Sequence, residues 1–314
     1  MTARHFLRDD DLSPQEQAAV LDLALRLKAE PFALASLAGP QVVALVFDKP
    51  TLRTQASFAA GVAELGGFPM TVDGALAGIG VRESVADTAR VLGRQSAAIV
   101  WRTFAQSSLE EMAAYAGVPV VNALTDELHP CQALADLLTV REHRGPLPGQ
   151  TLTFLGDAAS NMAHSLLLAG ATAGMHVRVS GPEGYRPDPA MLARAVEIAG
   201  TTGGSAISVD DPAEAAAGAD VLVTDTWISM GREAEAEARA EVFGAWRLDQ
   251  AMLERGADDA LVLHCLPAYR GKEITAEVLD GPRSVVWDEA ENRRHVQKAV
   301  LAALLDPGVL GEPT

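Results

Sequence analysis

The residues of this chain best suited to chemistry form the run Thr51-Leu52-Arg53-Thr54. The run follows an apolar, β-branched segment at residues 41–47 and precedes a helical pattern, so it joins a strand directly to a helix. Backbone N–H groups at the start of a helix lack intrahelical acceptors, and the helix dipole is positive there. Arg53 adds a permanently charged, planar donor, and the two threonine hydroxyls add more donors. The run therefore predicts an anion-binding site. A simple helix cap at Thr51, with Arg53 in solvent, fits these residues alone equally well.

Two other strand ends in the first half carry side chains that suit the same anion. Arg102 follows the apolar segment 97–101, and two arginines at neighbouring strand ends are more suggestive than one. His129 and Gln132 flank the start of a helix whose first residue is Pro130. Because a helix N-terminus disfavours an imidazolium, a neutral His129 could donate to an oxygen that becomes negative during a reaction. A surface arginine and a capping histidine are the alternative interpretations.

The second half carries polar residues at strand ends that suit a small ionic ligand. Asn161 follows the segment 151–155, and its amide could bind a carboxylate, although a helix cap is the alternative. Asp225 and Ser229 follow the segment 220–224 and suit an ammonium group and a carboxylate, respectively. A turn rich in side-chain caps would use the same residue types.

Cys265 also follows a predicted strand, and a thiol placed there could be a nucleophile. No base is spaced in sequence to activate it. The Leu266–Pro267 bond is a candidate for cis geometry. Residues 156–161 stand where the first turn of a dinucleotide-binding fold would lie, but they lack its G-x-G-x-x-G glycines, which disfavours a dinucleotide cofactor.

Short β-branched segments alternate with helical patterns, which predicts an α/β protein with parallel sheets flanked by helices. Ligands of such sheets bind at the carboxyl ends of the strands, where the polar residues fall. Strands are expected near residues 41–47, 69–72, 97–101, 118–122, 151–155, 175–180, 205–209, 220–224, 260–264 and 284–287. Helices are expected near residues 51–65, 84–94, 107–116, 130–143 and 291–305. Residues 231–245, rich in Ala and Glu, fit either a solvated helix or a mobile loop over a cleft.

Length and composition limit the possible classes of protein. The 314 residues suit two domains of roughly 150 residues each, and the proline- and glycine-rich segment 145–149 is the best boundary between them. The net charge of −17 disfavours nucleic acid and anionic lipid as partners. Two cysteines far apart in sequence indicate neither a disulfide framework nor a zinc finger. Residues 1–10 lack an apolar core, and no long apolar segment follows, so a cytoplasmic protein is expected.

Taken together, these segments resemble the aspartate/ornithine transcarbamoylase family, and within it the ornithine branch. Thr51–Thr54 is similar to the S-T-R-T carbamoyl phosphate signature, and His129–Gln132 is identical to H-P-C-Q. Asp225–Gly231 is similar to the D-T-W-x-S-M-G loop, and His264–Pro267 is identical to H-C-L-P. Glu291–Arg293 resembles the family's E-N-R element. The motifs follow one another in the family's order over nearly the whole chain.

The chain departs from the family pattern at a few positions. Leu52 replaces a threonine, Gln55 stands where a second arginine is common, and Ser160 replaces the first of two asparagines. Gly78 lacks the side chain that in relatives reaches a neighbouring subunit's active site, and Arg82 is a candidate to replace that contact.

The resemblance implies transfer of the carbamoyl group of carbamoyl phosphate to the δ-amine of L-ornithine, giving L-citrulline and phosphate. It implies no metal and no organic cofactor, and a homotrimer or a multiple of trimers. The carbamoyl phosphate domain would be residues 1–144, the ornithine domain residues 149–290, and a helix within residues 291–314 would return to the first domain. The carbamoyl phosphate residues would be Thr51, Leu52, Arg53, Thr54, Arg102, His129, Gln132, Cys265, Leu266 and Arg293. The ornithine residues would be Asn161, Asp225, Ser229 and Met230, and the catalytic residues Arg102, His129, Cys265 and Arg293.

Other functions stay open at this point. The same chemistry could act on putrescine or an N-acylated ornithine, although Asp225 with Ser229 favours a free amino acid. Leu52, Gln55 and Gly78 make a catalytically silent ligand-binding homologue conceivable. A nicotinamide oxidoreductase is disfavoured by the missing glycine fingerprint. Arginine synthesis and citrulline breakdown would use one and the same site.

Overall fold

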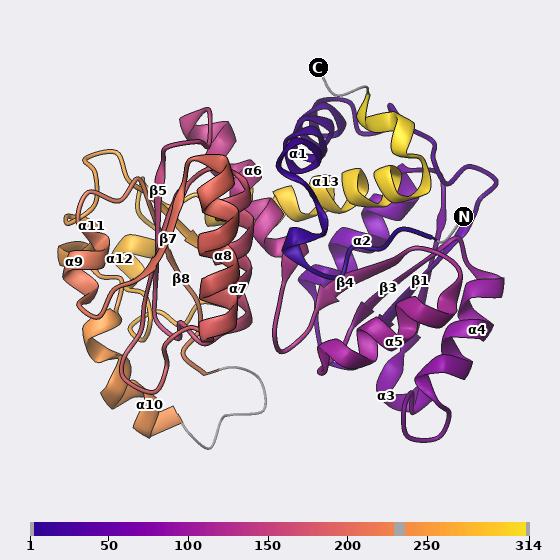
Figure 1. The fold of residues 1–314 in the computed structure, drawn as a ribbon, viewed down its shortest axis with the longest axis horizontal. Helices are drawn as coiled ribbons and strands as arrows, with labels where there is room; N and C mark the ends of the chain where they lie inside the picture. Colours follow the sequence, from indigo (N-terminus) through magenta and orange to yellow (C-terminus); the bar gives the residue numbers. More distant parts are fainter. Residues whose placement is uncertain (1–2, 229–235, 312–314) are drawn as a thin grey trace. The chain divides into compact units, whose positions relative to one another are not determined.

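The structure, a computed structural model, describes residues 3–228 and 236–311. The chain divides into two compact units, one holding Met1–Leu138 with Glu291–Thr314 and the other Thr139–Ala290. Each unit is a parallel sheet flanked by helices (Figure 1). This confirms the predicted α/β class. The sequence analysis placed the boundary after Arg144, whereas the division of the chain falls inside the helix α6 (Pro130–Arg144).

The first unit is built on a sheet of strand order β2-β1-β3-β4. Its strands are β1 (Val42–Phe47), β2 (Phe68–Asp73), β3 (Ala98–Arg102) and β4 (Val120–Leu124). Its helices are α1 (Pro14–Ala29), α2 (Arg53–Glu64), α3 (Gly74–Ala77), α4 (Val85–Gln95), α5 (Gln106–Ala116) and most of α13 (Val286–Leu305). Its 3-10 turns are η1 (Asp9–Asp11) and η4 (Pro307–Leu310). Apolar side chains of β1 and β3, among them Ile99 and Trp101, pack against Leu109 and Met112 of α5. Because central parallel strands are covered on both faces, β1 reads as a continuous apolar run.

The second unit is built on a sheet of strand order β7-β6-β5-β8-β9. Its strands are β5 (Thr151–Leu155), β6 (His176–Ser180), β7 (Ser205–Ser208), β8 (Val221–Thr224) and β9 (Leu261–His264). Its helices and one 3-10 turn are α7 (Asn161–Thr172), α8 (Pro189–Thr202), α9 (Pro212–Ala216), α10 (Ala236–Phe243), η3 (Gly244–Trp246), α11 (Gln250–Leu253) and α12 (Ala276–Leu279). α7 and α8 pack side by side along the sheet (Figure 1). All strand pairs in both units are parallel, as predicted.

One expected strand, at residues 284–287, is wrong. Ser284 makes only an isolated bridge with Val262, and α13 already begins at Val286. The apolar run looks like a buried strand, but Asp288 and Glu289 follow it, and acidic residues stabilise the first turn of a helix. Within the ambiguous segment 231–245, residues 236–243 form α10, whereas residues 231–235 lie outside the described part of the chain.

The glycine at the start of α3 is required by a close approach to the loop after β1. A Cβ atom added at Gly74 would lie 1.9 Å from Asp48 Oδ1. Asp48 is held on its other side by Trp101, whose Nε1 donates to Asp48 Oδ2 at 2.9 Å. The side chain at Asp48 therefore has little freedom to move aside.

We expect Gly74→Ala to lower the free energy of unfolding by about 1–3 kcal/mol, because the added methyl overpacks this contact. Gly200→Ala is the matched control, since a Cβ there meets nothing within 4 Å and alanine favours the helix α8. Urea unfolding of both variants measures the difference. Equal stability of the two variants would contradict the close approach at Gly74.

The last helix returns to the first unit, as predicted, where α13 lies beside α1 and α2 (Figure 1). On α13, the buried His295 has its Nε2 at 3.6 Å from Glu291 Oε1. Burial, and then the charges of Lys298, Arg294 and Lys28, lower the pKa of His295 to about 4, with Glu64 opposing them. The imidazole is therefore neutral in the folded protein near pH 7.

This lowered pKa predicts a loss of stability in mild acid. In the unfolded chain histidine titrates near pH 6.5, so the unfolded state takes up the proton first as the pH falls. The stability from a neutral His295 is complete above about pH 6.5 and is lost toward pH 4. Between pH 7 and 4.5 we expect the wild type to lose roughly 1–2 kcal/mol more than a His295→Leu variant, measured by urea unfolding. Equal losses in both proteins would exclude His295 as the cause.

Candidate functional site

The loop after β1 and the end of β3 are neighbours at one edge of the first sheet. Phe47 pairs with Arg102 in the β1–β3 register, and the Asp48 N–H donates to the Arg102 carbonyl at 2.9 Å. The Arg102 side chain is buried there. The parallel sheet thus brings the segment that leads to Arg53 next to Arg102, as expected for two carboxyl ends of adjacent strands.

The start of α2 differs from the capping interpretation of Thr51. The N-cap residue is Leu52, which makes no side-chain cap hydrogen bond and is 77% exposed. Because the Leu52 side chain is apolar, this residue can offer a ligand only its backbone N–H group. Arg53 is the first helical residue, and the hydroxyl of the buried Thr54 accepts a hydrogen bond from Arg293 Nη2 at 2.7 Å. The Thr54 hydroxyl still has its own proton to donate.

His129 lies buried among positive charges immediately before α6. Burial lowers its pKa well below 6.5, and the charges of Arg293, Arg102, Arg53 and Lys49 lower it further. The imidazole is therefore neutral and can donate a single hydrogen bond from one ring nitrogen. Four cations around one neutral imidazole make a site that favours an anion with a polarisable oxygen.

Lys49 was not among the residues selected from the sequence. It forms an ion pair with Asp126, and its Nζ lies 4.4 Å from the centre of the Phe104 ring. Its position two residues before Thr51 was the only sign in the sequence that Lys49 could belong to the same site. We did not select it because a lysine in a loop is ordinarily exposed to solvent.

Gln132 lies in the first turn of α6 and is fully buried. Its Nε2 donates to Oδ1 of the equally buried Asp136 at 2.8 Å. Asp136 is a second residue that sequence reasoning missed, although the spacing of four residues on a helix was the signal for the pair. Cys131 is structural, since burial raises the pKa of its thiol to about 12 and its Sγ contacts the Asn122 carbonyl at 3.5 Å.

In the second unit, the carboxyl ends of β5, β8 and β9 lie side by side because these strands are neighbours in the sheet. Asn161 is the first residue of α7, and the cap is Ser160, whose Oγ accepts from the Ala163 N–H at 3.3 Å. The capping interpretation therefore belongs to Ser160 rather than to Asn161. Asp225 follows β8 directly, and Cys265 follows β9 directly.

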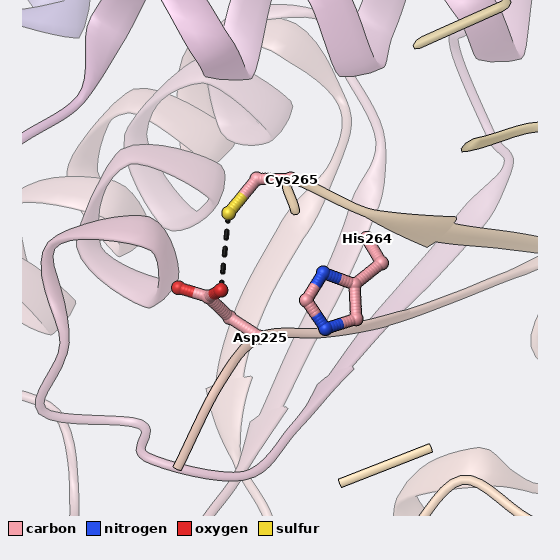
Figure 2. A group of neighbouring side chains, drawn as sticks. All are labelled: Asp225, His264 and Cys265. Atoms are coloured by element: carbon pink, nitrogen blue, oxygen red, sulfur yellow. Dashed lines mark hydrogen bonds between the residues drawn. The ribbon is translucent and has the colours of Figure 1, made fainter. Parts of the chain in front are cut away.

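Asp225 and Cys265 face each other across two adjacent strand ends (Figure 2). The Cys265 thiol donates to Asp225 Oδ1 at 3.0 Å, and the Thr226 N–H donates to the same oxygen at 2.7 Å. Burial raises the pKa of Asp225, while the nearby His264 and the two hydrogen bonds oppose that rise. The thiol therefore has a carboxylate partner that the sequence did not reveal, because 40 residues separate the two.

His264 organises the loop that carries Cys265. Its Nδ1 accepts from the Leu266 N–H at 2.9 Å, its Nε2 contacts Glu273 Oε1 at 3.2 Å, and its backbone N–H donates to Glu289 Oε2 at 2.8 Å. Leu266 adopts a left-handed conformation with φ of 57°, and the Leu266–Pro267 bond is cis, as predicted.

The side chains of Asp225, His264 and Cys265 are also close enough to share a metal ion. Their ligand atoms lie within 4.8 Å of one another, and this is the group of that kind found among residues 3–228 and 236–311 (Figure 2). Both ring nitrogens of His264 already make the contacts that hold its loop, so a metal would have to displace one of them. The observed geometry is that of a hydrogen-bonded cluster.

A buried arginine joins the loops after β5 and β8. Arg239 Nη1 donates to Asp157 Oδ2 and to the Trp227 carbonyl, both at 2.9 Å, and its guanidinium lies 4.9 Å from the Tyr185 ring centre. Sequence reasoning missed this arginine because it falls in the segment 231–245, which fitted either a solvated helix or a mobile loop. Ser229 and Met230, predicted for ornithine, lie outside the described residues.

The predicted residues thus fall into two groups, one in each unit. The first unit holds Thr51, Leu52, Arg53, Thr54, Arg102, His129, Gln132 and Arg293. The second holds Asn161, Asp225, Cys265 and Leu266. Cys265 and Leu266, predicted for carbamoyl phosphate, therefore belong to the unit that carries the Asp225 cluster.

In the described ranges, no helix is both long and apolar enough to cross a membrane.

The fold and these two groups define an α/β protein with a cluster of cations near a buried histidine at one parallel sheet and an acid–thiol cluster at a second. A family model described as the carbamoyl-P binding domain of aspartate/ornithine carbamoyltransferase matches residues 4–142. A second, described as the Asp/Orn binding domain of the same family, matches residues 148–304. The chain belongs to the aspartate/ornithine carbamoyltransferase family.

Several proteins that are similar to the chain over nearly its full length are named ornithine carbamoyltransferase, and a structure with 30% identity is that of an acetylornithine transcarbamylase. The chain is 62% identical to an ornithine carbamoyltransferase from Clavibacter sepedonicus, over 96% of this chain and 98% of that protein. A crystal structure of ornithine carbamoyltransferase from Gloeobacter violaceus has a TM-score of 0.88 and 49% identity, covering 97% of this chain and 99% of that one. The ornithine carbamoyltransferase from Pyrococcus furiosus has a TM-score of 0.93 and 41% identity, covering 98% of each chain.

Proposed function

We infer that the protein transfers the carbamoyl group of carbamoyl phosphate to the δ-amine of L-ornithine, giving L-citrulline and phosphate. The family, and the name shared by relatives that are 55–62% identical to this chain, support this function over the other classes considered. The observation in the structure that carries it is the neutral, buried His129 with Arg53, Arg102, Arg293 and Lys49 around it. A cluster of this kind suits a phosphate attached to a carbonyl.

The first unit would bind carbamoyl phosphate through the start of α2. The backbone N–H groups of Leu52 and Arg53, the Arg53 and Arg102 side chains and the hydroxyls of Thr51 and Thr54 supply donors for the phosphate oxygens. We assign the carbonyl oxygen to His129, Arg102, Arg293 and Thr54. A neutral imidazole and fixed cations stabilise the charge that grows on this oxygen when the amine attacks. Gln132, oriented by Asp136, would bind the carbamoyl amide.

The second unit would bind ornithine through the ends of β5 and β8. Asn161 and Ser229 suit the α-carboxylate, and Asp225 suits the α-ammonium group; Met230 would complete the site. The δ-amine must attack as the neutral form, although a free amine of this kind has a pKa of about 10.4. Cys265 and Leu266 are assigned beside this amine.

The reaction forms a C–N bond to the amine and breaks the C–O bond to phosphate. Phosphate leaves with the electron pair of that C–O bond, and the attacking nitrogen loses a proton, which the departing phosphate can accept, as the ureido group of citrulline forms. Phosphate is already a good leaving group, so positioning and electrostatic stabilisation can supply much of the rate. No step of this scheme calls for a metal or an organic cofactor.

We further propose a homotrimer, or a multiple of trimers, in the cytoplasm. Exposed apolar side chains support an association surface on the first unit: Leu52 is 77%, Leu76 79% and Val81 90% exposed. Gly78 lies in this region in a left-handed conformation, with a φ of 66°, and an added Cβ would lie 3.0 Å from Arg82 Cγ. Arg82 remains our candidate for a contact with a neighbouring subunit.

The proposed function is tested by measuring product formation with purified protein, carbamoyl phosphate and a panel of amines. We expect citrulline from ornithine at a kcat/KM at least 100-fold above that for putrescine or N-acetylornithine, since both lack a free α-ammonium group for Asp225. Preferred carbamoylation of either competitor would assign the protein to another acceptor. Phosphate or carbamoyl phosphate binding without turnover of any amine would identify a silent homologue.

A further inference from the structure

We propose that Lys298 is a positioning residue for Arg293, because its buried ion pair with Glu64 fixes the helix α13 against α2. The proposal rests on the proposed function in one respect, namely that Arg293 and Thr54 act on carbamoyl phosphate. Lys298 itself is fully buried and lies on α13 five residues after Arg293, outside the motifs considered above.

The ammonium group of Lys298 is fully buried, with 0% of the residue exposed, and it is surrounded by acceptors. Its Nζ donates to the Leu27 carbonyl at 3.0 Å, to the Pro31 carbonyl at 3.3 Å and to Glu64 Oε2. An ammonium has three protons, and each has an acceptor here. Because a buried charge is costly unless it is paired and hydrogen-bonded, this geometry allows few alternative positions for Lys298.

The same two helices are joined at both ends of α2. At its start, Arg293 donates to Thr54, and at its last residue Glu64 binds Lys298. Between them, α2 presents Gly61, where an added Cβ would lie only 3.0 Å from Lys298 Cγ. The absence of a side chain at Gly61 thus makes room for the lysine stem and lets the helices approach closely.

Arg293 and Lys298 lie five positions apart on α13, which places them about 140° apart around the helix and about 7.5 Å apart along it. Two contacts in different directions fix both the rotation and the axial position of a helix. With Lys298 released, α13 could rotate or slide, and the Arg293 guanidinium would move from Thr54. A displacement of about 1 Å in a catalytic group can lower a rate by about 100-fold.

The test compares Lys298→Met with Arg294→Met. Methionine keeps the length of the lysine stem and removes the charge. Arg294 is the matched control because it lies on the same helix and pairs with the same Glu64 at 3.2 Å, but its side chain is 33% exposed. We expect Lys298→Met to lower kcat 10- to 100-fold and to weaken carbamoyl phosphate binding about 10-fold, whereas Arg294→Met changes either by less than 2-fold.

A double-mutant cycle separates positioning from a structural role. In an Arg293→Ala background we expect Lys298→Met to lower kcat by less than a further 2-fold, because its effect passes through Arg293. Additive losses, a fully active Lys298→Met variant or equal effects of Lys298→Met and Arg294→Met would each overturn the proposal.

If Lys298→Met does not fold, Glu64→Gln replaces it in the cycle, since the amide oxygen of glutamine still accepts from Lys298 Nζ. We expect Glu64→Gln to lower kcat about 3-fold in the wild-type background and to have no effect on kcat in the Arg293→Ala background.

Failure of the proposed function has a different result. If the wild type forms no citrulline, the affinity for inorganic phosphate, measured by calorimetry, replaces kcat in the same comparison. Weaker phosphate binding by Lys298→Met, but not by Arg294→Met, would then support the positioning role even though the reaction was assigned wrongly. A wild type that binds neither phosphate nor carbamoyl phosphate would overturn both proposals.

Discussion

Replacement of Arg53 by alanine is expected to lower kcat/KM for carbamoyl phosphate by about 1,000-fold, which corresponds to about 4 kcal/mol of transition-state stabilisation. Arg53 is the first residue of α2, and its charge contributes to the low pKa of His129. Its guanidinium and the helix N-terminus would act on the same phosphate, so the loss should appear both in binding and in kcat. Steady-state kinetics with ornithine saturating and carbamoyl phosphate varied measures it.

Arg90→Ala is the control for a change in the charge of the first unit. Arg90 lies on α4, its side chain is 47% exposed, and it pairs with Asp87 at the surface. We expect this variant to differ from the wild type by less than 2-fold, because exposed ion pairs contribute little and salt screens distant charges. Near-normal carbamoyl transfer by Arg53→Ala would reject the assignment of the phosphate to the start of α2.

Replacement of Asp225 by asparagine is expected to lower kcat/KM for ornithine by about 100- to 1,000-fold, with carbamoyl phosphate affinity changed by less than 2-fold. The carboxylate of Asp225 would lose its charge, and with it both the partner of the ammonium group and the charged acceptor of the Cys265 thiol. Asparagine keeps the size of the side chain, so the fold of the β8 end should persist. Citrulline formation at varied ornithine, together with calorimetric binding of carbamoyl phosphate, separates the two effects.

The matched control is Asp280→Asn, which removes a carboxylate of the same unit from a surface ion pair with Arg270. The Asp280 side chain is 50% exposed, and we expect unchanged kinetics. An Asp225→Asn variant that binds both substrates equally poorly would indicate that Asp225 is structural. Rescue of the variant by a substrate without an α-ammonium group would support its assigned role.

The fold was predictable from the sequence because its strands are buried parallel ones. Residues 42–47 are apolar throughout, and residues 221–223 are apolar before Thr224 ends the strand; parallel strands covered on both faces require such runs. The prediction at residues 284–287 was wrong for the same reason, since a buried helix start and a buried strand share an apolar run of this length. The folded chain distinguishes the helix start from the strand, because Ser284 makes only an isolated bridge there and no continuous strand pairing.

The candidate site was predictable where the local sequence specifies backbone geometry. The strand-to-helix turns at Arg53 and His129 follow from apolar runs that end in helix-start signals, and the polar residues fall at carboxyl ends of strands as a result. The pairs Gln132–Asp136, Cys265–Asp225 and Lys298–Glu64 were not predicted. Each depends on which side chains meet after folding, and burial rather than sequence spacing selects the partner.

By itself, the sequence of this protein determined the α/β class, most strand and helix positions, and the residue types at the strand ends. Local periodicity and turn chemistry encode these features. The tertiary structure alone decided that four cations act on a neutral, buried His129, that Cys265 donates to Asp225, and that the buried Lys298 pairs with Glu64. Charge and desolvation act through space, so groups far apart in the chain acquire their chemistry only when the fold removes them from water and places them together.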